Sequence, residues 1–305
     1  MRSARNVNRD EAHKAYQTLY IPSITYGLPA TCVPRATLDK IQSQALSIFL
    51  PKMGINGHHP RTSLYAPIST GGLGLTHLYT EQGVQHTIQA LRHLRNKHSE
   101  LHKPIRAAYS WYHRTAGTTR PPWETPTTKM PHLPQIWIHT ITLHLQEQKL
   151  AISTPHQQPI KQRRAHDSSI MDKILQGGFT NHEIKLFNLA RLYLKAECIS
   201  DLTNAEGTEI TQSVLHVSNP TAPSQPTNED WPLQANPSPT TWTKFRTMLR
   251  RVYTSGDASK TLTTPLGTWH PTSKHRRQTS YWDKANETVI INEGSLQFVS
   301  KIKNE

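Results

Sequence analysis

The 305-residue sequence has little of several features that would identify common protein classes. It contains two cysteines, Cys32 and Cys198, far apart along the chain, which excludes a disulfide-rich scaffold and a cysteine-rich zinc site. Hydrophobic residues make up 35% of the chain, and no apolar run approaches the roughly 20 residues of a membrane-spanning helix. The first residues also lack the apolar core of a signal peptide. We therefore expect an intracellular protein, in the nucleus or cytoplasm, with no membrane partner.

Acidic residues are also few. The chain carries 35 Lys and Arg against 21 Asp and Glu, a formal net charge of +14. Residues 1–115 hold 14 basic and 5 acidic residues, and residues 240–284 hold 9 basic and 2 acidic residues. This excess favours a polyanionic partner, nucleic acid before membrane. A basic surface without a specific partner is the alternative.

Residue patterns that carry catalysis are missing as well. A polymerase or nuclease needs carboxylates that converge on Mg²⁺, but there is no Asp-Asp pair, and the adjacent pair Glu229-Asp230 lies in a Pro-rich stretch. His98 and His102 are four residues apart without the order of a metalloprotease, and no G-x-S-x-G motif is present. Cys32 has no base near it in the sequence and is predicted to be a small buried residue. We expect no catalytic residue, no metal and no cofactor.

Residues 10–103 are predicted to form a compact helical domain. The first helix covers residues 10–20, with Asp10 as its N-cap and with Tyr16, Leu19 and Tyr20 facing the core. A second helix is predicted to begin at a Thr37 cap and to end at Pro51, with its apolar positions at Leu38, Ile41, Ala45, Ile48 and Phe49.

A glycine-rich turn precedes a third helix in this domain. Gly71, Gly72 and Gly74 match neither the dinucleotide fingerprint nor the P-loop, which leaves a turn as their role. The helix that follows has a predicted inward stripe of Val84, Ile88, Leu91 and Leu94. The basic residues of this helix and of the stretch after it are predicted to contact phosphates: Arg92, Arg95, Lys97 and Lys103.

Three stretches of this domain carry a family resemblance. IPSITYG, LDKIQSQALSIFL and PRTSLYAPISTGGLGL follow one another in an order that resembles the segment after the catalytic palm of LINE-type (non-LTR) retrotransposon reverse transcriptases. In that family the segment builds the helical thumb, which holds the primer-template duplex by its backbone. The resemblance covers about residues 11–100, and its anchors are packing or turn positions: Tyr26, Gly27, Leu38 to Ala45, and Gly71 to Leu75, which includes Gly72 and Gly74.

The resemblance implies a fragment of an RNA-directed DNA polymerase that has no catalytic residue of its own. The palm would lie upstream of Met1, or in an associated reverse transcriptase chain that contains one. The phrase LARLYLKAECISDLTNAEG is similar to a stretch downstream of the thumb in some retroelement polyproteins.

The middle of the chain is predicted to be looser. Residues 104–160 read as a Pro-rich connector with one helix over residues 136–150, where a strand stays open. Residues 161–217 are predicted to be a helical unit with one helix capped by Asp167 and another that starts at a capping box, Thr180 and Glu183. Arg191 on the second helix is expected to form an ion pair with Asp201 or Glu197.

The C-terminal third is predicted to join a linker to a small basic module. Residues 218–239 read as a Pro/Ser/Thr linker, and residues 240–299 as a basic helix capped by Thr241 followed by a small antiparallel β meander over residues 266–299. Arg276 and Arg277 lie near Trp269, Tyr281 and Trp282, a mixture of cationic and stacking groups that single strands favour. The alternative is that these aromatic residues form the core of the meander.

Together these patterns predict a mainly α chain that binds RNA or an RNA/DNA hybrid, as primer-template, through a basic thumb. Two alternatives stay open. One is a free-standing basic protein whose residues 160–299 bind a protein partner, and the other is a retroelement relic with no function.

Overall fold

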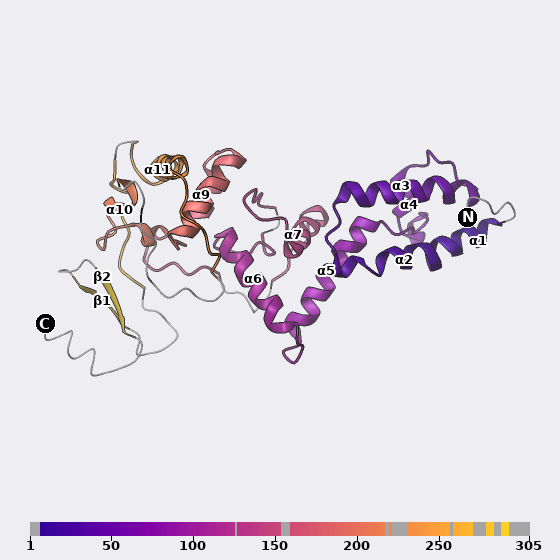
Figure 1. Ribbon diagram of the computed structural model, residues 1–305, viewed down its shortest axis with the longest axis horizontal. Coiled ribbons are helices and arrows are strands. Elements are labelled where there is room, and N and C mark those ends of the chain that lie inside the picture. Colours follow the sequence, from indigo (N-terminus) through magenta and orange to yellow (C-terminus); the bar gives the residue numbers. More distant parts are fainter. Residues whose placement is uncertain are drawn as a thin grey trace. The chain divides into compact units, whose positions relative to one another are not determined.

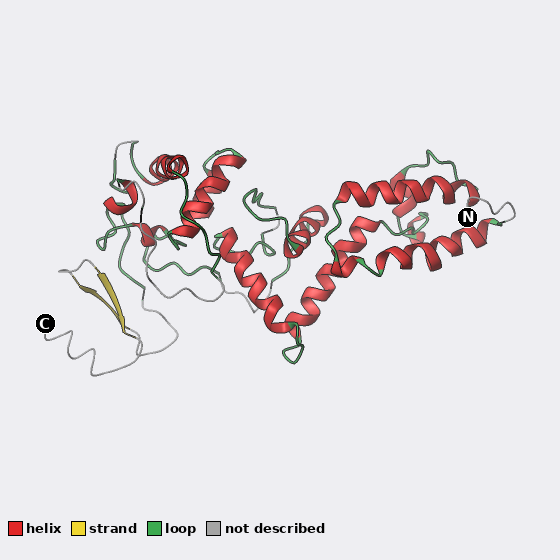
Figure 2. Ribbon diagram, viewed as in Figure 1, coloured by secondary structure: helices red, strands yellow, loops and turns green. Residues whose placement is uncertain are grey.

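The protein is mainly helical. The computed structural model describes residues 7–125, 127–153, 159–216, 220, 231–256 and 259–270, and the backbone of residues 279–283 and 288–292. Figure 2 shows helices and loops throughout the described residues, with strands confined to those last two segments. None of the described helices has the length and apolar character needed to cross a bilayer.

The chain divides into two compact units. Unit 1 comprises residues 1–106 and 134–151, and unit 2 comprises residues 107–133 and 152–305. Residues 104–160 hold most of α6 (His102–Ala116) and all of α7 (Trp137–Gln148), where the sequence predicts one helix. The helix predicted over residues 136–150 is confirmed against the strand that stayed open, and it belongs to unit 1.

Unit 1 begins with a rod of three short helical segments. Helix α1 (Arg9–Ala15) continues through a π-helical turn (Tyr16–Tyr20) into α2 (Ile21–Thr25), beside α3 (Arg35–Lys52), as Figure 1 shows. The wide turn precedes Pro22, whose ring and missing N–H do not fit a regular helical bond to the residue four positions earlier.

Two predictions about the first helix are wrong. Its N-cap is Asn8, which forms a capping box with Glu11, and Asp10 lies inside the first turn. Leu19 is 69% exposed, whereas Tyr16 is fully buried, stacks with Tyr20 and meets Phe49 edge-on. The π-helical turn changes the angular spacing after Tyr16, which explains why a regular helical period misplaces Leu19.

Helix α3 follows its prediction more closely. Its core face contains Leu38, Ala45 and Phe49, and the helix ends just after Pro51, although Pro34 and not Thr37 lies at its N-cap. The core also contains a polar residue, Gln42, whose amide donates to Thr76 O at 2.6 Å and accepts from Leu78 N at 2.9 Å.

The glycine turn lies between α4 (Arg61–Tyr65), a short 3₁₀ turn (Ile68–Thr70) and α5 (Leu78–Arg95). Gly71 and Gly74 have positive φ angles of 84° and 61°. A Cβ on Gly72 would lie 2.1 Å from the carbonyl oxygen of Ala66. The prediction of a turn is confirmed, and each of the three glycines has a backbone reason.

Tyr26 and Gly27, two anchors of the resemblance, lie in a turn and not in the packed core. Tyr26 is 91% exposed at the end of α2, and Gly27 has a helical φ of −85° with no atom near the position of a Cβ.

Gly72→Ala is expected to lower the free energy of unfolding by about 3 kcal/mol, because the new methyl group meets backbone and no side chain can move aside. Gly27→Ala is the matched control, and it should leave stability unchanged or raise it slightly. Chemical denaturation of both variants tests this. Equal stabilities for the two would contradict the role of Gly72.

Helix α5 does not bury the stripe that its sequence predicts. Its buried residues are Leu78, Gln82, Gly83, His86, Ala90 and Leu94. Leu94 is therefore correctly predicted, whereas Ile88 is 58% exposed and Val84 is 37% exposed. The reason is close packing, because a Cβ on Gly83 would lie 2.3 Å from the His144 ring of α7.

Unit 2 is built around a second core. Helix α9 (Asn181–Tyr193) packs on α11 (Pro239–Tyr253), with the rings of Phe187 and Phe245 4.6 Å apart. Helix α8 (Ile170–Gln176), a 3₁₀ turn (Ile199–Leu202) and α10 (Gln212–Leu215) complete the core.

The caps of unit 2 confirm one prediction and correct two. The capping box of Thr180 and Glu183 is confirmed. Ser169 caps α8 and Ser238 caps α11, where Asp167 and Thr241 are predicted. Asp167 instead accepts bonds from Arg163 N and Ser200 Oγ, at 3.0 and 2.8 Å.

The small β meander is not supported. Within the described residues, β1 (Thr279–Asp283) and β2 (Thr288–Asn292) form one antiparallel pair. Trp269, predicted to belong to the meander, instead forms a bridge with Arg164, and the guanidinium of Arg164 lies 4.8 Å from the Trp269 ring centre.

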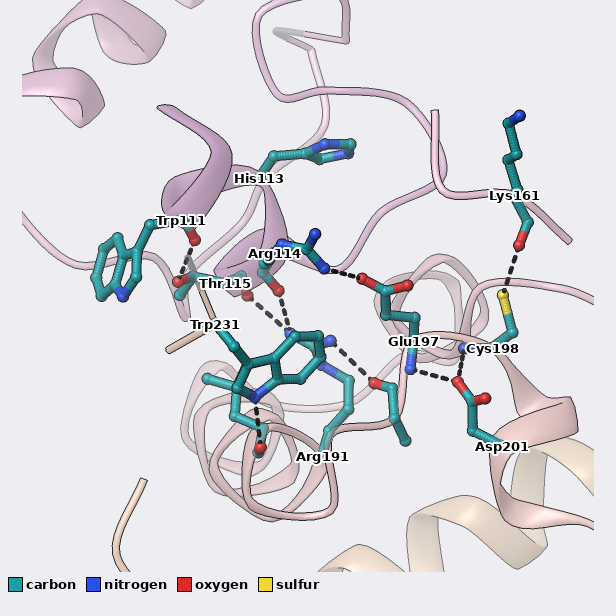
Figure 3. Close-up of polar contacts among 12 residues, drawn as sticks. Trp111, His113, Arg114, Thr115, Lys161, Arg191, Glu197, Cys198, Asp201 and Trp231 are labelled. Carbon is teal, nitrogen blue, oxygen red and sulfur yellow. Dashed lines mark hydrogen bonds and ion pairs between the residues drawn. The ribbon is translucent and has the colours of Figure 1, made fainter. Parts of the chain in front are cut away.

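A buried guanidinium holds the loops of unit 2 together (Figure 3). Arg191 is fully buried on α9, and its side chain donates to four oxygens, on Asn188 (2.9 Å), Ala196 (3.1 Å), Arg114 (2.6 Å) and Thr115 (3.1 Å). Burial lowers the pKa of Arg191 to about 10, which still leaves it charged at neutral pH. Three of the four acceptors are backbone carbonyls, so one side chain satisfies carbonyls at the end of α6 and in the loop after α9.

The predicted ion pair of Arg191 is therefore wrong. Glu197 pairs with Arg114 at 2.9 Å, and Asp201 pairs with Arg163 at 2.8 Å. Both carboxylates lie near Arg191 in sequence, but its planar guanidinium is already occupied by the oxygens of the chain.

Arg191→Lys is expected to lower the free energy of unfolding by about 3 kcal/mol, because an ammonium group keeps the charge but cannot reach acceptors in three directions. The matched control is Lys185→Arg, an exchange between the same residue types on the exposed side of α9, which should change stability by less than about 0.5 kcal/mol. Thermal and chemical unfolding measure both. A loss of less than about 1 kcal/mol for Arg191→Lys would contradict this role.

Candidate nucleic-acid interface

The predicted phosphate contacts of unit 1 lie where α5 ends and α6 begins. We call residues 92–106 the α5–α6 corner. This stretch holds five Lys and Arg residues and one acidic residue, Glu100. Arg92, Arg95, Lys97 and Lys103 are all exposed, so the structure leaves each of them accessible.

Short-range hydrogen bonds shape the corner. The side chain of Asn96 accepts from His98 N at 3.1 Å, and Ser99 Oγ lies 2.7 Å from His93 Nδ1 and 3.3 Å from Leu101 N. His102 Nδ1 contacts the His93 carbonyl oxygen at 3.0 Å. These contacts tie the first turn of α6 to the last turn of α5, so the basic residues are presented from a defined turn.

None of the side chains that the structure describes neutralises the charges of the corner. Among the described residues, Arg92, Arg95, Lys97 and Lys103 take part in none of the ion pairs. By contrast, Arg35 on α3 pairs with Asp39 and with Glu147. The last-turn position of Arg92 and Arg95 also places them at the negative end of the α5 dipole, which favours cations there whatever they bind. Exposed cations without partners remain available to an external anion.

Aliphatic side chains lie beside these arginines. Ile88, Leu91, Arg92, Arg95 and Asn96 line a shallow, open hollow on the outward side of α5. Leu91 is half-buried, and Ile88 is more than half exposed. The outward side of α5 therefore combines positive charge with apolar surface.

Sequence reasoning missed one feature of the corner and one feature of the α5 surface beside it. Arg106 is exposed on α6, one turn after Lys103, and its spacing could have revealed it. The exposure of Ile88 and Leu91 could not be found in this way, because an apolar helical stripe ordinarily faces the core.

The second predicted basic site lies outside the described residues. Nothing is described of Arg276 or Arg277, and only the backbone is described for Tyr281 and Trp282. Trp269, the remaining aromatic residue of that group, packs against Arg164. Arg164 is itself buried and donates to the carbonyl oxygens of Gly267, Ala205 and Glu206, so this contact belongs to the architecture of unit 2.

The histidine and cysteine candidates are not brought together. His98 is exposed in the corner turn and His102 is buried at the start of α6, so the two do not share a helix face. In the part of the chain that the structure describes, no group of three metal-ligating side chains converges. Cys32 is exposed, contrary to its prediction, whereas Cys198 is buried and burial raises the pKa of its thiol.

Comparison with protein-family models, with curated proteins and with solved structures finds no match. The geometry of the α5–α6 corner is therefore the observation on which a functional assignment rests.

Ser99→Ala is expected to loosen the corner, because its hydroxyl contacts both His93 and the Leu101 N–H. The loss should be about 1 kcal/mol in the free energy of unfolding, as for other side-chain caps of backbone groups. Ser47→Ala on α3 is the control, since that exposed hydroxyl donates to the carbonyl of Gln44 within its own helix. Urea denaturation measures both, and equal losses would show that Ser99 has no special role.

Proposed function

We propose that this chain binds nucleic acid through the α5–α6 corner of unit 1, as a thumb-like module of a LINE-type reverse transcriptase without a palm of its own. The ligand in this proposal is primer-template, as RNA or an RNA/DNA hybrid. Binding involves phosphate contacts that confer affinity without sequence choice.

One observation carries the proposal. Four basic side chains lie within twelve residues, exposed where α5 ends and α6 begins, and none of them has an acidic partner among the described residues. The resemblance of residues 11–100 supplies the family, and the formal net charge of +14 is consistent with a polyanionic ligand. Association with a reverse transcriptase chain that contains a palm is part of the same proposal.

A specific observation favours a second candidate. Ile88 and Leu91 form an apolar surface next to Arg92 and Arg95, a combination that also suits an acidic, apolar segment of a protein. In that case α5 would serve a free-standing basic interaction protein. The two candidates differ in salt dependence, because only the release of counterions from nucleic acid gives a steep linear decrease of log K with log salt.

The double variant Arg92→Ala/Arg95→Ala is expected to weaken binding to a labelled RNA/DNA hybrid and to reduce the magnitude of the salt slope by about two. Fluorescence anisotropy over a series of salt concentrations measures both quantities. The control is Lys14→Ala/Lys40→Ala, which removes the same charge from exposed positions on α1 and α3. This control should retain the slope of the unmodified protein.

A slope that is the same in both double variants would contradict the assignment of the corner. No binding of the unmodified protein to any oligonucleotide at low salt would refute the proposal as a whole. Capture of an acidic peptide with little dependence on salt, lost in an Ile88→Ser variant, would support the second candidate.

A further inference from the structure

The contact between α5 and α7 inside unit 1 contains two buried histidines. His86 on α5 is fully buried, and its ring contacts Trp137, with ring centres 5.6 Å apart. His144 on α7 is 5% exposed, and its ring lies against Gly83 of α5. We propose that His86 and His144 make this contact a pH-sensitive clamp, which holds residues 134–151 in unit 1 at neutral pH and releases them on acidification.

The hydrogen-bond partners of His86 suit both its neutral and its protonated ring. Its Nε2 lies 2.8 Å from the carbonyl oxygen of Leu28, so this nitrogen must carry a hydrogen. Its Nδ1 lies 2.6 Å from Thr140 Oγ1, which in turn lies 2.6 Å from the carbonyl oxygen of Trp137. In neutral His86, Nδ1 accepts a hydrogen bond from the Thr140 hydroxyl. In protonated His86, the Nδ1–H donates to Thr140 Oγ1, and the hydroxyl donates to the Trp137 carbonyl oxygen. The bonds of His86 therefore survive protonation, and the added charge is what changes.

The hydrogen bonding of His144 suits only its neutral ring. Its Nδ1 is buried and has no hydrogen-bond partner among the residues that the structure describes, so in the neutral ring this nitrogen carries the lone pair. Protonation would create a buried N–H with nothing to accept it, at the cost of an unsatisfied buried donor. The positive charges of His86 and His144 would also repel each other across the contact.

The surrounding elements supply little compensating charge. On α7, Glu147 is the one carboxylate that acts on His144, and it already pairs with Arg35 of α3. Around His86, the groups that favour its charged form are the backbones of Leu28 and Thr31. Helix α2 and the 3₁₀ turn Leu28–Ala30, which also pack on α5, contain no titratable side chain.

The direction of the pH effect follows from burial. Desolvation lowers the pKa of His86, of His144 and of His139 on the same helix below the ordinary value of 6.5. A histidine whose pKa is lowered by folding contributes stability that is fully present above its unfolded pKa. That contribution is lost as pH falls through 6.5 toward the folded pKa values. Release of α7 lets the histidines ionise in water, so acid favours the open state.

Hydrogen exchange of the full chain, at pH 7.5 and 5.5 and corrected for intrinsic rates, tests the clamp. Amides of residues 137–148 should lose protection about tenfold or more at the lower pH, while amides of α3 keep theirs. His144→Phe, which keeps a ring against Gly83 but cannot titrate, should make this loss clearly smaller, with the remainder due to His86 and His139. His98→Gln, at an exposed position of the same unit, should leave it unchanged.

Three results would overturn the clamp. Protection of α7 that is equal at both pH values is one, and an equal acid loss in α3, which would indicate global unfolding, is another. The third is a full acid response in His144→Phe. If the α7 amides of His144→Phe are already unprotected at pH 7.5, the clamp is tested instead by the α7 protection of His86→Gln and by the pH dependence of α7 protection in the unmodified protein. None of these outcomes depends on nucleic-acid binding.

Discussion

Helix α5 is held in unit 1 by its polar residues. The amide of Gln82 donates to Val33 O at 3.1 Å and accepts from Val33 N at 3.0 Å. One side chain therefore satisfies both backbone groups of a residue that lies outside helices and strands. His86 reaches the Leu28 carbonyl, and Gln42 of α3 caps the start of α5 at Leu78 N. A buried polar group must be bonded, and these groups can only be bonded when this side of α5 faces inward. The orientation of α5 about its own axis therefore determines which of its side chains lie on the surface of unit 1.

The aliphatic and basic residues of α5 face outward as a consequence. Ile88 and Leu91 lie next to Arg92 and Arg95 because the inner side is occupied by Gln82, Gly83 and His86. The proposed interface and the proposed clamp are thus opposite sides of one helix, and both follow from the same hydrogen bonds.

Buried polar side chains are also hydrogen-bonded in unit 2, where they are arginines. Arg191 and Arg164 are buried, and each donates mainly to backbone carbonyls of loops and helix ends. Such bonds hold irregular backbone where regular ladders are absent, which is consistent with a chain in which 35% of the residues are hydrophobic. Gly117 and Gly207 make room for these side chains, since a Cβ on either would lie within 2.8 Å of a guanidinium carbon.

Local patterns by themselves determined the features of this protein that depend on neighbours in the sequence. These are the mainly helical class, the capping box at Thr180, the glycine turn at Gly71 to Gly74 and the basic stretch after Arg92. Only the tertiary structure decided which side of α5 is buried, which oxygens Arg191 binds and where Cys32 lies. A prediction from apolar periodicity assumes that the more apolar side of a helix faces inward. In α5, the close approach of His144 to Gly83 and the hydrogen bonds of buried polar groups decide which side is buried. Those partners are distant along the chain, so no local pattern contains them.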